Sequence, residues 1–266
     1  MQLASPPAPP TTLEMGIRCH AHDFVDNSPP RTMAPLTPTL SPEAPVPVLK
    51  IVDTYDVPGM ASNVNLNLIN LNISADFVTN NDPITKTRFI DERSGQHLLR
   101  VDDEPKITGW SGDIPFPLEH YDAIVVSDYN KGFLSYMDII HLIKNSECPV
   151  FIDTKKHDLN MFNMPDTYVK INEMEFNNSS SKHDNLIVTL GSRGAMHNGD
   201  VYPTTKVEVM DVCGCGDTFM AALVTQYLFT KDIEKSILFA NIAAGITVQH
   251  RGNYAPTYDE IRIAGY

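Results

Sequence analysis

The sequence has few cysteines, a shortage of positive charge and no long apolar segment. Its 4 cysteines show no spacing of a disulfide framework, which argues against a disulfide-stapled secreted domain. Lys and Arg number 20 against 33 Asp and Glu, which argues against a surface for nucleic acid or anionic membranes. No apolar run approaches the roughly 18 residues that span a bilayer, and the N-terminus lacks a signal-like apolar stretch. These absences predict a soluble, cytoplasmic protein with small-molecule partners.

The N-terminal segment is rich in proline. Of the 20 prolines, eleven lie before residue 48, and residues 1–40 show neither a helical nor a strand period. A segment with so little apolar surface to bury does not form a packed core. We therefore expect a Pro-rich irregular tail over residues 1–40 and a folded domain over residues 41–266.

The first part of this domain predicts short strands and one helix. Residues 46–53 have the apolar content of a strand, and residues 59–72 carry Val, Leu and Ile at helical spacing. Residues 85–90 and 97–101 are two further short strands, and the Arg-Ser-Gly turn between them is typical of a hairpin.

From residue 120 onward, short apolar runs alternate with helix-length segments. The runs at 123–126, 150–152, 168–171 and 186–190 are continuous and rich in β-branched residues, which suits strands covered on both faces. The pattern predicts an α/β fold with a mostly parallel sheet and helices on either side. A polar residue or a glycine follows each run. Because ligands bind beyond the carboxyl ends of parallel strands, these positions are expected to carry the chemistry.

The last third of the chain predicts two helices. The first covers residues 217–229, and the second follows Asp232, a good N-cap residue, to about residue 249.

The segment Asp211–Phe219, DVCGCGDTF, has three interpretations. As a metal site it has a C-x-C pair with no second Cys or His pair at zinc-finger spacing, and as a redox pair it lacks the C-x-x-C spacing. As a turn it follows a strand at 206–210, and Gly214 and Gly216 free the backbone before a helix that starts at Asp217. Amides at a helix N-terminus bind anions, although an ordinary loop-to-helix turn has the same sequence features. The extra carboxylate favours the anion site, since it suits a base beside a transferring phosphoryl group.

Four segments in order resemble the motifs of the ribokinase-like (PfkB) carbohydrate kinases. DVCGCGDTF is similar to the signature D-[TV]-x-G-A-G-D-x-F, with Cys215 in place of the alanine. The other matches are Gly59–Asn63 to the sugar motif G-G-x-x-x-N with Met60 replacing a glycine, Asn172–Glu175 to N-x-x-E, and Thr189–Gly194 to T-x-G-x-x-G. The resemblance implies a ribokinase-like three-layer sandwich with a mostly parallel central sheet and a small β lid from about 46–53 and 85–103.

Within this family, residues 41–262 resemble most the kinase domain of heptose 7-phosphate kinase/adenylyltransferase enzymes. The segments that carry this likeness are Ser41–Val48, Thr85–Arg88, Gln96 with Leu99–Asp102, and Ser127–Gly132. The resemblance implies ATP-dependent phosphorylation of the anomeric hydroxyl of D-glycero-D-manno-heptose 7-phosphate. It also implies ATP and Mg²⁺ as cofactors, K⁺ as a further ion, and a homodimer formed through the lid, with no nucleic acid or membrane as a partner.

The resemblance also assigns the roles of the reacting groups. Asp217 is expected to take the proton of the attacking sugar hydroxyl, and a plain helix cap is the alternative for this residue. Glu175, together with Asn172, is expected to order Mg²⁺ through water, and a helix-capping arrangement is the alternative for this pair. The anion hole is expected to consist of the amides of Gly214, Cys215 and Gly216.

The remaining expected contacts fall into three groups. The ATP-binding residues are Asn172, Glu175, Gly191, Gly194, Asn241 and Ala244, for which close packing of a turn and a helix is the alternative. The substrate-binding residues are Gly59, Asn63, Arg88, Arg100, Asp128 and Lys131, and solvated surface is the alternative for the two arginines. Asp211 is expected to support a monovalent cation.

Two departures from the family pattern bear on activity. Family members begin with a buried strand that ends in G-D-x-x-x-D, whereas the segment before Ser41 offers only His22–Asp26 in a Pro-rich context. The segment between Leu71 and Phe77 also looks too short for the strand and helix that usually follow the sugar motif. The sequence therefore leaves two hypotheses, a working sugar-phosphate kinase and a non-catalytic relative that retains the nucleotide pocket as a binding or regulatory protein.

Overall fold

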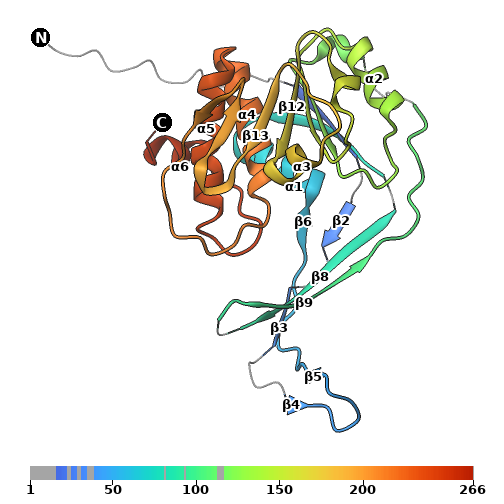
Figure 1. Cartoon of the computed structure of the whole chain (residues 1–266), viewed down its shortest axis with the longest axis vertical. Coiled ribbons are helices and arrows are strands. Elements are labelled where there is room, and N and C mark those ends of the chain that lie inside the picture. The colour runs from blue at the N-terminus through green and yellow to red at the C-terminus, as the bar shows by residue number, and fades with distance from the viewer. Residues whose placement is uncertain are drawn as a thin grey trace, which may run out of the picture.

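The computed structural model describes residues 16–22, 25–28, 31–34, 39–80, 82–92, 94–112 and 117–265. In these residues an eight-stranded sheet has the order β15-β14-β13-β12-β11-β10-β1-β7, and helices cover both of its faces (Figure 1). The neighbours from β13 to β7 run parallel, whereas β14 and β15 are antiparallel additions at one edge. The strands are β1 (Gly16–His22), β7 (Ser74–Val78), β10 (Ile124–Asp128), β11 (Val150–Thr154), β12 (Thr167–Asn172), β13 (Leu186–Thr189), β14 (Ala195–His197) and β15 (Asp200–Tyr202).

Among the residues that the structure describes, four helices begin after a residue whose side chain caps them, namely Ser135, Asn172, Asp232 and Thr257. The helices after Gly59 and Gly214 have no side-chain cap. Asp232 accepts hydrogen bonds from the amides of Glu234 and Lys235 at the start of α5, as its N-cap type predicts. No helix in the described part of the chain is long and apolar enough to cross a bilayer. The helices are α1 (Met60–Asn70), α2 (Tyr136–Asn145), α3 (Glu173–Asn178), α4 (Cys215–Thr230), α5 (Ile233–Thr247) and α6 (Tyr258–Ile263), with short 3₁₀ helices η1 (Leu118–His120), η2 (Leu159–Phe162) and η3 (Gly191–Arg193).

The alternation of side chains along the strands divides the core into two layers. Val125 and Phe151 point into one cluster, which also contains apolar residues of α1, α4 and α5. Their strand neighbours Ile124 and Ile152 point into the other cluster, which contains residues of α2. Because successive residues of a strand face opposite sides, both faces of the sheet are packed. The expected three-layer α/β sandwich is confirmed.

A second sheet extends away from the sandwich (Figure 1). Its order is β3-β8-β2-β6, and β9 pairs with β8 as an antiparallel hairpin. Its strands are β2 (Val25–Ser28), β3 (Arg31–Ala34), β6 (Val57–Gly59), β8 (Pro83–Asp91) and β9 (His97–Asp103), and a separate pair is formed by β4 (Thr39–Leu40) and β5 (Pro47–Val48). The hairpin predicted at 85–103 is therefore confirmed, and this sheet is the β lid of the fold.

The strand expected at 46–53 is wrong for most of its length. In that range β5 covers only Pro47–Val48, and β5 pairs with β4 rather than with the β8–β9 hairpin. The side chains of Ile51 and Val52 are exposed. An apolar run forms a strand only where a partner strand supplies hydrogen bonds, and residues 49–52 have no such partner in the part of the chain that the structure describes. Apolar composition alone was therefore not enough to predict a strand here.

The irregular tail expected over residues 1–40 is also wrong where the structure describes it. β1 lies inside the sheet and pairs in parallel with β10 on one side and β7 on the other, and β2 and β3 belong to the lid. The sequence of β1, GIRCHAH, has too few apolar residues to stand out as a buried strand. In the segment His22–Asp26, β1 ends at His22 and β2 begins at Val25, while residues 23 and 24 lie outside the described residues, as do residues 1–15.

Two smaller expectations need correction. The segment after α1 does contain a strand, because β7 follows within a few residues and forms the edge of the sheet. The strand expected at 206–210 does not form among the described residues, and α4 begins at Cys215 rather than at Asp217. Asp217 therefore lies inside the first helical turn.

Candidate active site

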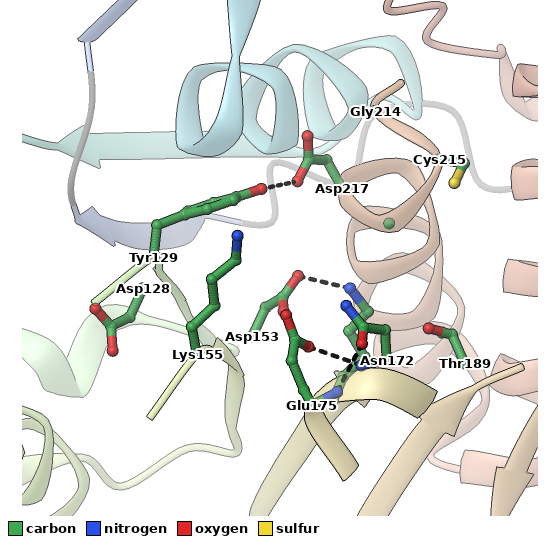
Figure 2. A pocket seen from close by; sticks show the side chains of 12 residues that line it. Asp128, Tyr129, Asp153, Lys155, Asn172, Glu175, Thr189, Gly214, Cys215 and Asp217 are labelled. Atoms are coloured by element: carbon green, nitrogen blue, oxygen red, sulfur yellow. Dashed lines mark hydrogen bonds and ion pairs between the residues drawn. The ribbon is translucent and has the colours of Figure 1, made fainter. Parts of the chain in front are cut away.

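A cleft of about 280 Å³ lies where the carboxyl ends of β10, β11 and β12 meet the N-terminus of α4 (Figure 2). This is the edge of a parallel sheet at which ligands are expected. Its lining consists of Asp128, Tyr129, Asp153, Lys155, Lys170, Asn172, Glu175, Thr189, Gly214, Cys215, Gly216 and Asp217. The structure thus brings the predicted base, the predicted anion hole and the N-x-x-E pair to one place.

Asp217 is a buried carboxylate held by two hydrogen bonds. Its side chain is 6% exposed, and it accepts from Asn63 Nδ2 and from the Tyr129 hydroxyl, each at 2.9 Å. Burial raises the pKa of Asp217 to about 6, and the Asn63 donor opposes that shift. The group is thus largely ionised at neutral pH and is more basic than an exposed aspartate.

The start of α4 depends on Gly214, which has a left-handed backbone with φ 76°. A Cβ there would lie 2.7 Å from Asn63 Nδ2, so only glycine lets the turn approach the amide that holds Asp217. The first amides of an α-helix have no acceptor within the helix and favour an anion. The amide of Cys215 already donates to the Val212 carbonyl at 3.4 Å, and its sulfur points away from Asp217 (Figure 2).

Lys170 and Asp153 form an ion pair in the cleft that the sequence analysis missed. Lys170 Nζ lies 2.7 Å from an Asp153 oxygen, and the lysine side chain is 7% exposed. Burial lowers the pKa of Lys170, but the Asp153 carboxylate more than reverses this, so the pKa is raised and the cation persists. A Cβ on Gly216 would lie 3.1 Å from Lys170 Nζ. The ammonium group therefore sits against the first turn of α4, close to the predicted anion hole.

Asn172 and Glu175 form a capping box at the start of α3. The Glu175 amide donates to Asn172 Oδ1 and the Asn172 amide donates to Glu175 Oε2, both at 2.8 Å. The capping alternative is therefore present in the structure. Both side chains still line the cleft, and the Glu175 carboxylate has lone pairs that one hydrogen bond does not use.

Asp128 borders the cleft, but its carboxylate contacts Thr154 and Lys156 in a buried cluster. Its Oδ2 accepts from Thr154 Oγ1 at 2.7 Å and lies 3.2 Å from Lys156 Nζ, in a buried cluster. The next residue, Tyr129, points toward Asp217, and the amino group of Lys155 lies 4.6 Å from the centre of its ring (Figure 2). Tyr129 and Lys155, which the sequence analysis did not assign to the site, are thus better placed to meet a substrate than the Asp128 side chain.

The other predicted substrate residues are not among those that line the cleft. Lys131 pairs with Glu104 at 2.5 Å, and Arg100 pairs with Asp102 at 2.8 Å on the lid hairpin. Arg88 donates to the Lys86 carbonyl at 3.2 Å. Gly59 is the N-cap of α1, the helix that carries Asn63. Asn63 donates a hydrogen bond to Asp217, so it positions the predicted base.

Of the other predicted nucleotide residues, Gly194 and Asn241 meet at the Tyr202 carbonyl, at the edge of the sheet that β15 forms. Gly194, with φ 92°, packs so closely against the backbone of residues 202–204 that a Cβ would be 2.1 Å from the Tyr202 carbonyl oxygen. Asn241 Nδ2 donates to the same carbonyl at 2.8 Å. Gly191 begins η3, and Ala244 lies one turn beyond Asn241 on α5. These contacts are packing contacts within the chain, and the role of these residues with a nucleotide stays a prediction.

Replacing Asn63 by leucine is expected to raise the pKa of Asp217 by about one to two units, because a hydrogen bond to a charged group contributes about 1.5–3 kcal/mol. Replacing Tyr129 by phenylalanine is expected to raise it by less, since its donor contributes less to lowering the pKa. The titration can be followed by carbon NMR of the Asp217 carboxyl.

The matched control is Asn70→Leu, which removes an amide of the same helix that donates instead to the Ala255 carbonyl. An unchanged titration midpoint in Asn63→Leu would show that Asn63 does not hold the carboxylate.

Comparison with known proteins agrees with this geometry. Residues 134–260 match the model of the pfkB family of carbohydrate kinases. The bifunctional protein HldE of Pseudomonas fluorescens (strain SBW25) is 30% identical over 289 residues, covering 86% of this chain and 60% of that protein. The HldE of Pasteurella multocida (strain Pm70) is 30% identical over 274 residues, covering 81% and 57%. The chain thus spans about 60% of the length of the curated relatives it matches.

Solved structures share the fold at low sequence identity. Ribokinase of Thermotoga maritima superposes with a TM-score of 0.69 at 16% identity, covering 95% of this chain and 99% of that chain. Phosphofructokinase-2 of Escherichia coli, solved with substrates and products, superposes with a TM-score of 0.68 at 15% identity, covering 93% and 98%. The sandwich with its β lid is therefore the ribokinase fold. Residues 134–260 thus form a domain that matches the pfkB family of carbohydrate kinases, and the similarity to HldE proteins extends over 81–86% of the chain.

Proposed function

We propose that this sugar kinase transfers the γ-phosphoryl group of ATP to the anomeric hydroxyl of D-glycero-D-manno-heptose 7-phosphate, giving the sugar bisphosphate and ADP. The observation that carries the proposal is the buried Asp217 carboxylate in the first turn of α4, with Lys170 against the same turn. The choice of sugar is supported by the heptose-branch segments of the sequence and by the similarity to HldE proteins.

Asp217 would act as the general base. Its carboxylate accepts the proton of the sugar hydroxyl as the oxygen of that hydroxyl attacks the phosphorus atom. Asn63 and Tyr129 hold the carboxylate in one orientation by donating to its two oxygens. Because phosphoryl transfer has a loose transition state, correct placement of the base matters more than its strength. The pKa of about 6 keeps Asp217 ready to accept a proton at neutral pH.

The negative charge of the migrating phosphoryl group would meet two kinds of positive charge. The amides around Gly216 offer the partial charge of a helix N-terminus, and Lys170 offers a full charge beside them. Lys155, whose amino group lies in the same opening, would contact a second anionic group of the bound reactants (Figure 2). A few local cations and amides thus suit phosphorylated ligands on an acidic protein.

The donor set of the cleft fits a hard divalent cation. Carboxylate and amide oxygens of Glu175, Asp153 and Asn172 line one wall, and such oxygens, with water, are the ligands that Mg²⁺ prefers. Glu175 and Asn172 would hold the ion through water, and the ion would neutralise phosphate charge. The monovalent cation at Asp211 and the role of Gly191, Gly194, Asn241 and Ala244 toward ATP stay predictions that rest on the resemblance.

The non-catalytic alternative has lost its main support. It rested on an N-terminal half that seemed to lack a first strand, whereas β1 occupies an interior place in the sheet and β7 forms the edge. A homodimer through the lid is a further proposal. It is supported by exposed apolar side chains on and near the lid, namely Leu99, Val101, Val46, Val48, Ile51 and Val52.

The test is an ADP-release assay with Mg·ATP and a panel of sugar phosphates. We expect turnover with heptose 7-phosphate and a much lower kcat/KM with ribose 5-phosphate, fructose 6-phosphate and the heptose that lacks the phosphate. Phosphorus NMR of the product should show a new phosphate on the anomeric carbon. A preference for another sugar phosphate would overturn the heptose assignment while leaving the kinase, and nucleotide binding without turnover on any sugar would overturn both.

A further inference from the structure

Three chain segments converge on one side of the lid, beside the loop that leads into α4. The turn of the β8–β9 hairpin lies against the 250–252 segment, since a Cβ on Gly95 would be 3.2 Å from the guanidinium carbon of Arg251. The same segment is tied to the loop before α4, because the Gly252 amide donates to Asp211 Oδ2 at 2.9 Å. The lid hairpin and the loop that leads into α4 are therefore neighbours through a common third segment.

A group of potential metal ligands lies at this junction. His97, the first residue of β9, comes within 4.8 Å of both Asp211 and Cys213, measured between one ligand atom on each side chain. Ligands around a tetrahedral zinc ion are roughly 3.5 Å apart, given Zn–N and Zn–S bonds of about 2.0 and 2.3 Å. Small side-chain rotations would bring the three atoms to this spacing. His97 is exposed, so an ion can reach the group from solvent.

The Asp211 carboxylate is already held in place by two backbone amides. Asp211 Oδ1 accepts from the Cys213 amide at 3.0 Å, and Oδ2 accepts from the Gly252 amide. Each carboxylate oxygen has a further lone pair, and hydrogen bonds that fix a ligand carboxylate are a usual feature of metal sites. The hydrogen bond to the Cys213 amide also keeps the cysteine next to the carboxylate.

The kinds of donor atom decide which ion suits the group. Mg²⁺, Ca²⁺ and the alkali cations prefer a shell of oxygen atoms, whereas imidazole and thiolate together select zinc and similar transition metals. One thiolate and one carboxylate also balance the charge of a divalent ion. We propose that His97, Asp211 and Cys213 form a binding site for a thiophilic divalent transition metal ion such as Zn²⁺, with the fourth position left to water. This ion would take the place of the monovalent cation that the resemblance predicts at Asp211.

Occupation of this site would fasten the lid. His97 belongs to the hairpin, whereas Asp211 and Cys213 belong to the loop that ends where α4 begins. A bound ion would add strong bonds between two segments that the chain connects only through more than a hundred intervening residues. The amides at the start of β9 should then open less often to solvent. This inference concerns metal binding alone and does not depend on the proposed kinase reaction.

The test uses the full chain after removal of metal. Zn²⁺ affinity is measured by competition with a chromogenic chelator, and Co²⁺ is added separately because a cobalt–thiolate bond gives a near-ultraviolet charge-transfer band. We expect one equivalent to bind, with that band present. His97→Ala and Cys213→Ser should each weaken binding by at least about tenfold, the scale at which even outer partners of metal ligands act. The cobalt band should disappear in Cys213→Ser.

The matched controls remove the same chemical groups elsewhere. His141 is an exposed histidine on α2, and Cys148 is a half-buried cysteine whose pKa is raised by burial to about 11, so that its thiol stays protonated. His141→Ala and Cys148→Ser should bind both ions as the wild type does.

Because His97 is exposed, His97→Ala is expected to fold like the wild type. Equal Zn²⁺ affinity in this variant and in the wild type would overturn the proposed site. A cobalt complex without the thiolate band would overturn it as well. Hydrogen exchange supplies the second readout. Zn²⁺ should slow the exchange of the amides of residues 97–101 in the wild type and not in Cys213→Ser. Binding that left this exchange unchanged would overturn the fastening of the lid.

Discussion

Replacing Asp217 by asparagine is expected to lower kcat for ADP release by about 10²- to 10⁴-fold, the usual contribution of a general base. Asparagine has nearly the same shape and can still accept from the Tyr129 hydroxyl, so the cleft should keep its form. It cannot take up the proton of the sugar hydroxyl. Because the two substrates would still be held by other groups, we expect KM for ATP to change little.

The same substitution is expected to stabilise the fold at neutral pH. In the folded chain burial raises the pKa of Asp217 from 3.8 to about 6, so the folded state holds the proton more tightly than the unfolded state. The free energy of unfolding therefore falls as pH rises from about 4 to about 6. At 1.36 kcal/mol per pKa unit, the total loss above pH 6 is up to about 3 kcal/mol. Asparagine removes this cost, but when its oxygen accepts from the Tyr129 hydroxyl its NH₂ group faces the Asn63 donor, so a smaller gain is expected.

Urea unfolding at pH 5 and pH 8 together with the kinetic assay checks both parts. The stability difference between variant and wild type should be larger at pH 8 than at pH 5. The control is Asp122→Asn, which neutralises an exposed carboxylate and should alter neither quantity. Full activity of Asp217→Asn would remove the base from the mechanism, and a stability difference that does not depend on pH would contradict the buried, titrating carboxylate.

Replacing Lys170 by methionine is expected to lower kcat by about 10²- to 10³-fold, the effect of losing one group that stabilises transition-state charge. It should also destabilise the fold, because the Asp153 partner would remain as an unpaired and nearly buried carboxylate. Loss of activity alone would therefore not separate a role in the reaction from a role in the structure.

The double variant Lys170→Met/Asp153→Asn separates them. Removing both charges of a buried pair restores much of the stability that removing one of them loses. We expect the double variant to unfold at nearly the wild-type urea concentration and to be slower in the ADP-release assay than Asp153→Asn alone, which measures the contribution of Asp153 to the cleft. The control Lys144→Met changes an exposed lysine at the end of α2 and should be neutral in both measurements. Recovery of turnover in the double variant would give Lys170 a structural role only.

Much of the candidate site could be predicted because it is local in sequence. Gly214 and Asp217 lie within one loop-to-helix turn, and Asn172 and Glu175 lie within another. The spacing within each pair can therefore be recognised in the sequence. The site residues that were missed come from different strands. Lys170 and Asp153 meet only because β11 and β12 are neighbours in the sheet.

The direction of side chains is a second property that the sequence leaves open. Asp128 and Tyr129 are consecutive residues at the end of β10, and the sequence analysis chose the carboxylate for the substrate. In the structure Asp128 turns into the cluster with Thr154 and Lys156, and Tyr129 reaches Asp217. Successive residues of an extended chain point to opposite sides. Asp128 therefore packs in the buried cluster, whereas the next residue, Tyr129, points into the cleft.

The sequence by itself determined the elements whose cause is local: the apolar strands after residue 120, the helices after their caps, and the glycine turn before Asp217. Only the tertiary structure decided the place of β1, the ion pair in the cleft, and the meeting of His97 with Asp211 and Cys213. The physical reason is that a strand with few apolar residues, or a charge without a partner nearby in sequence, becomes favourable only through neighbours from distant parts of the chain. Such neighbours are supplied by the packing of the sheet and leave no periodic signal in the sequence.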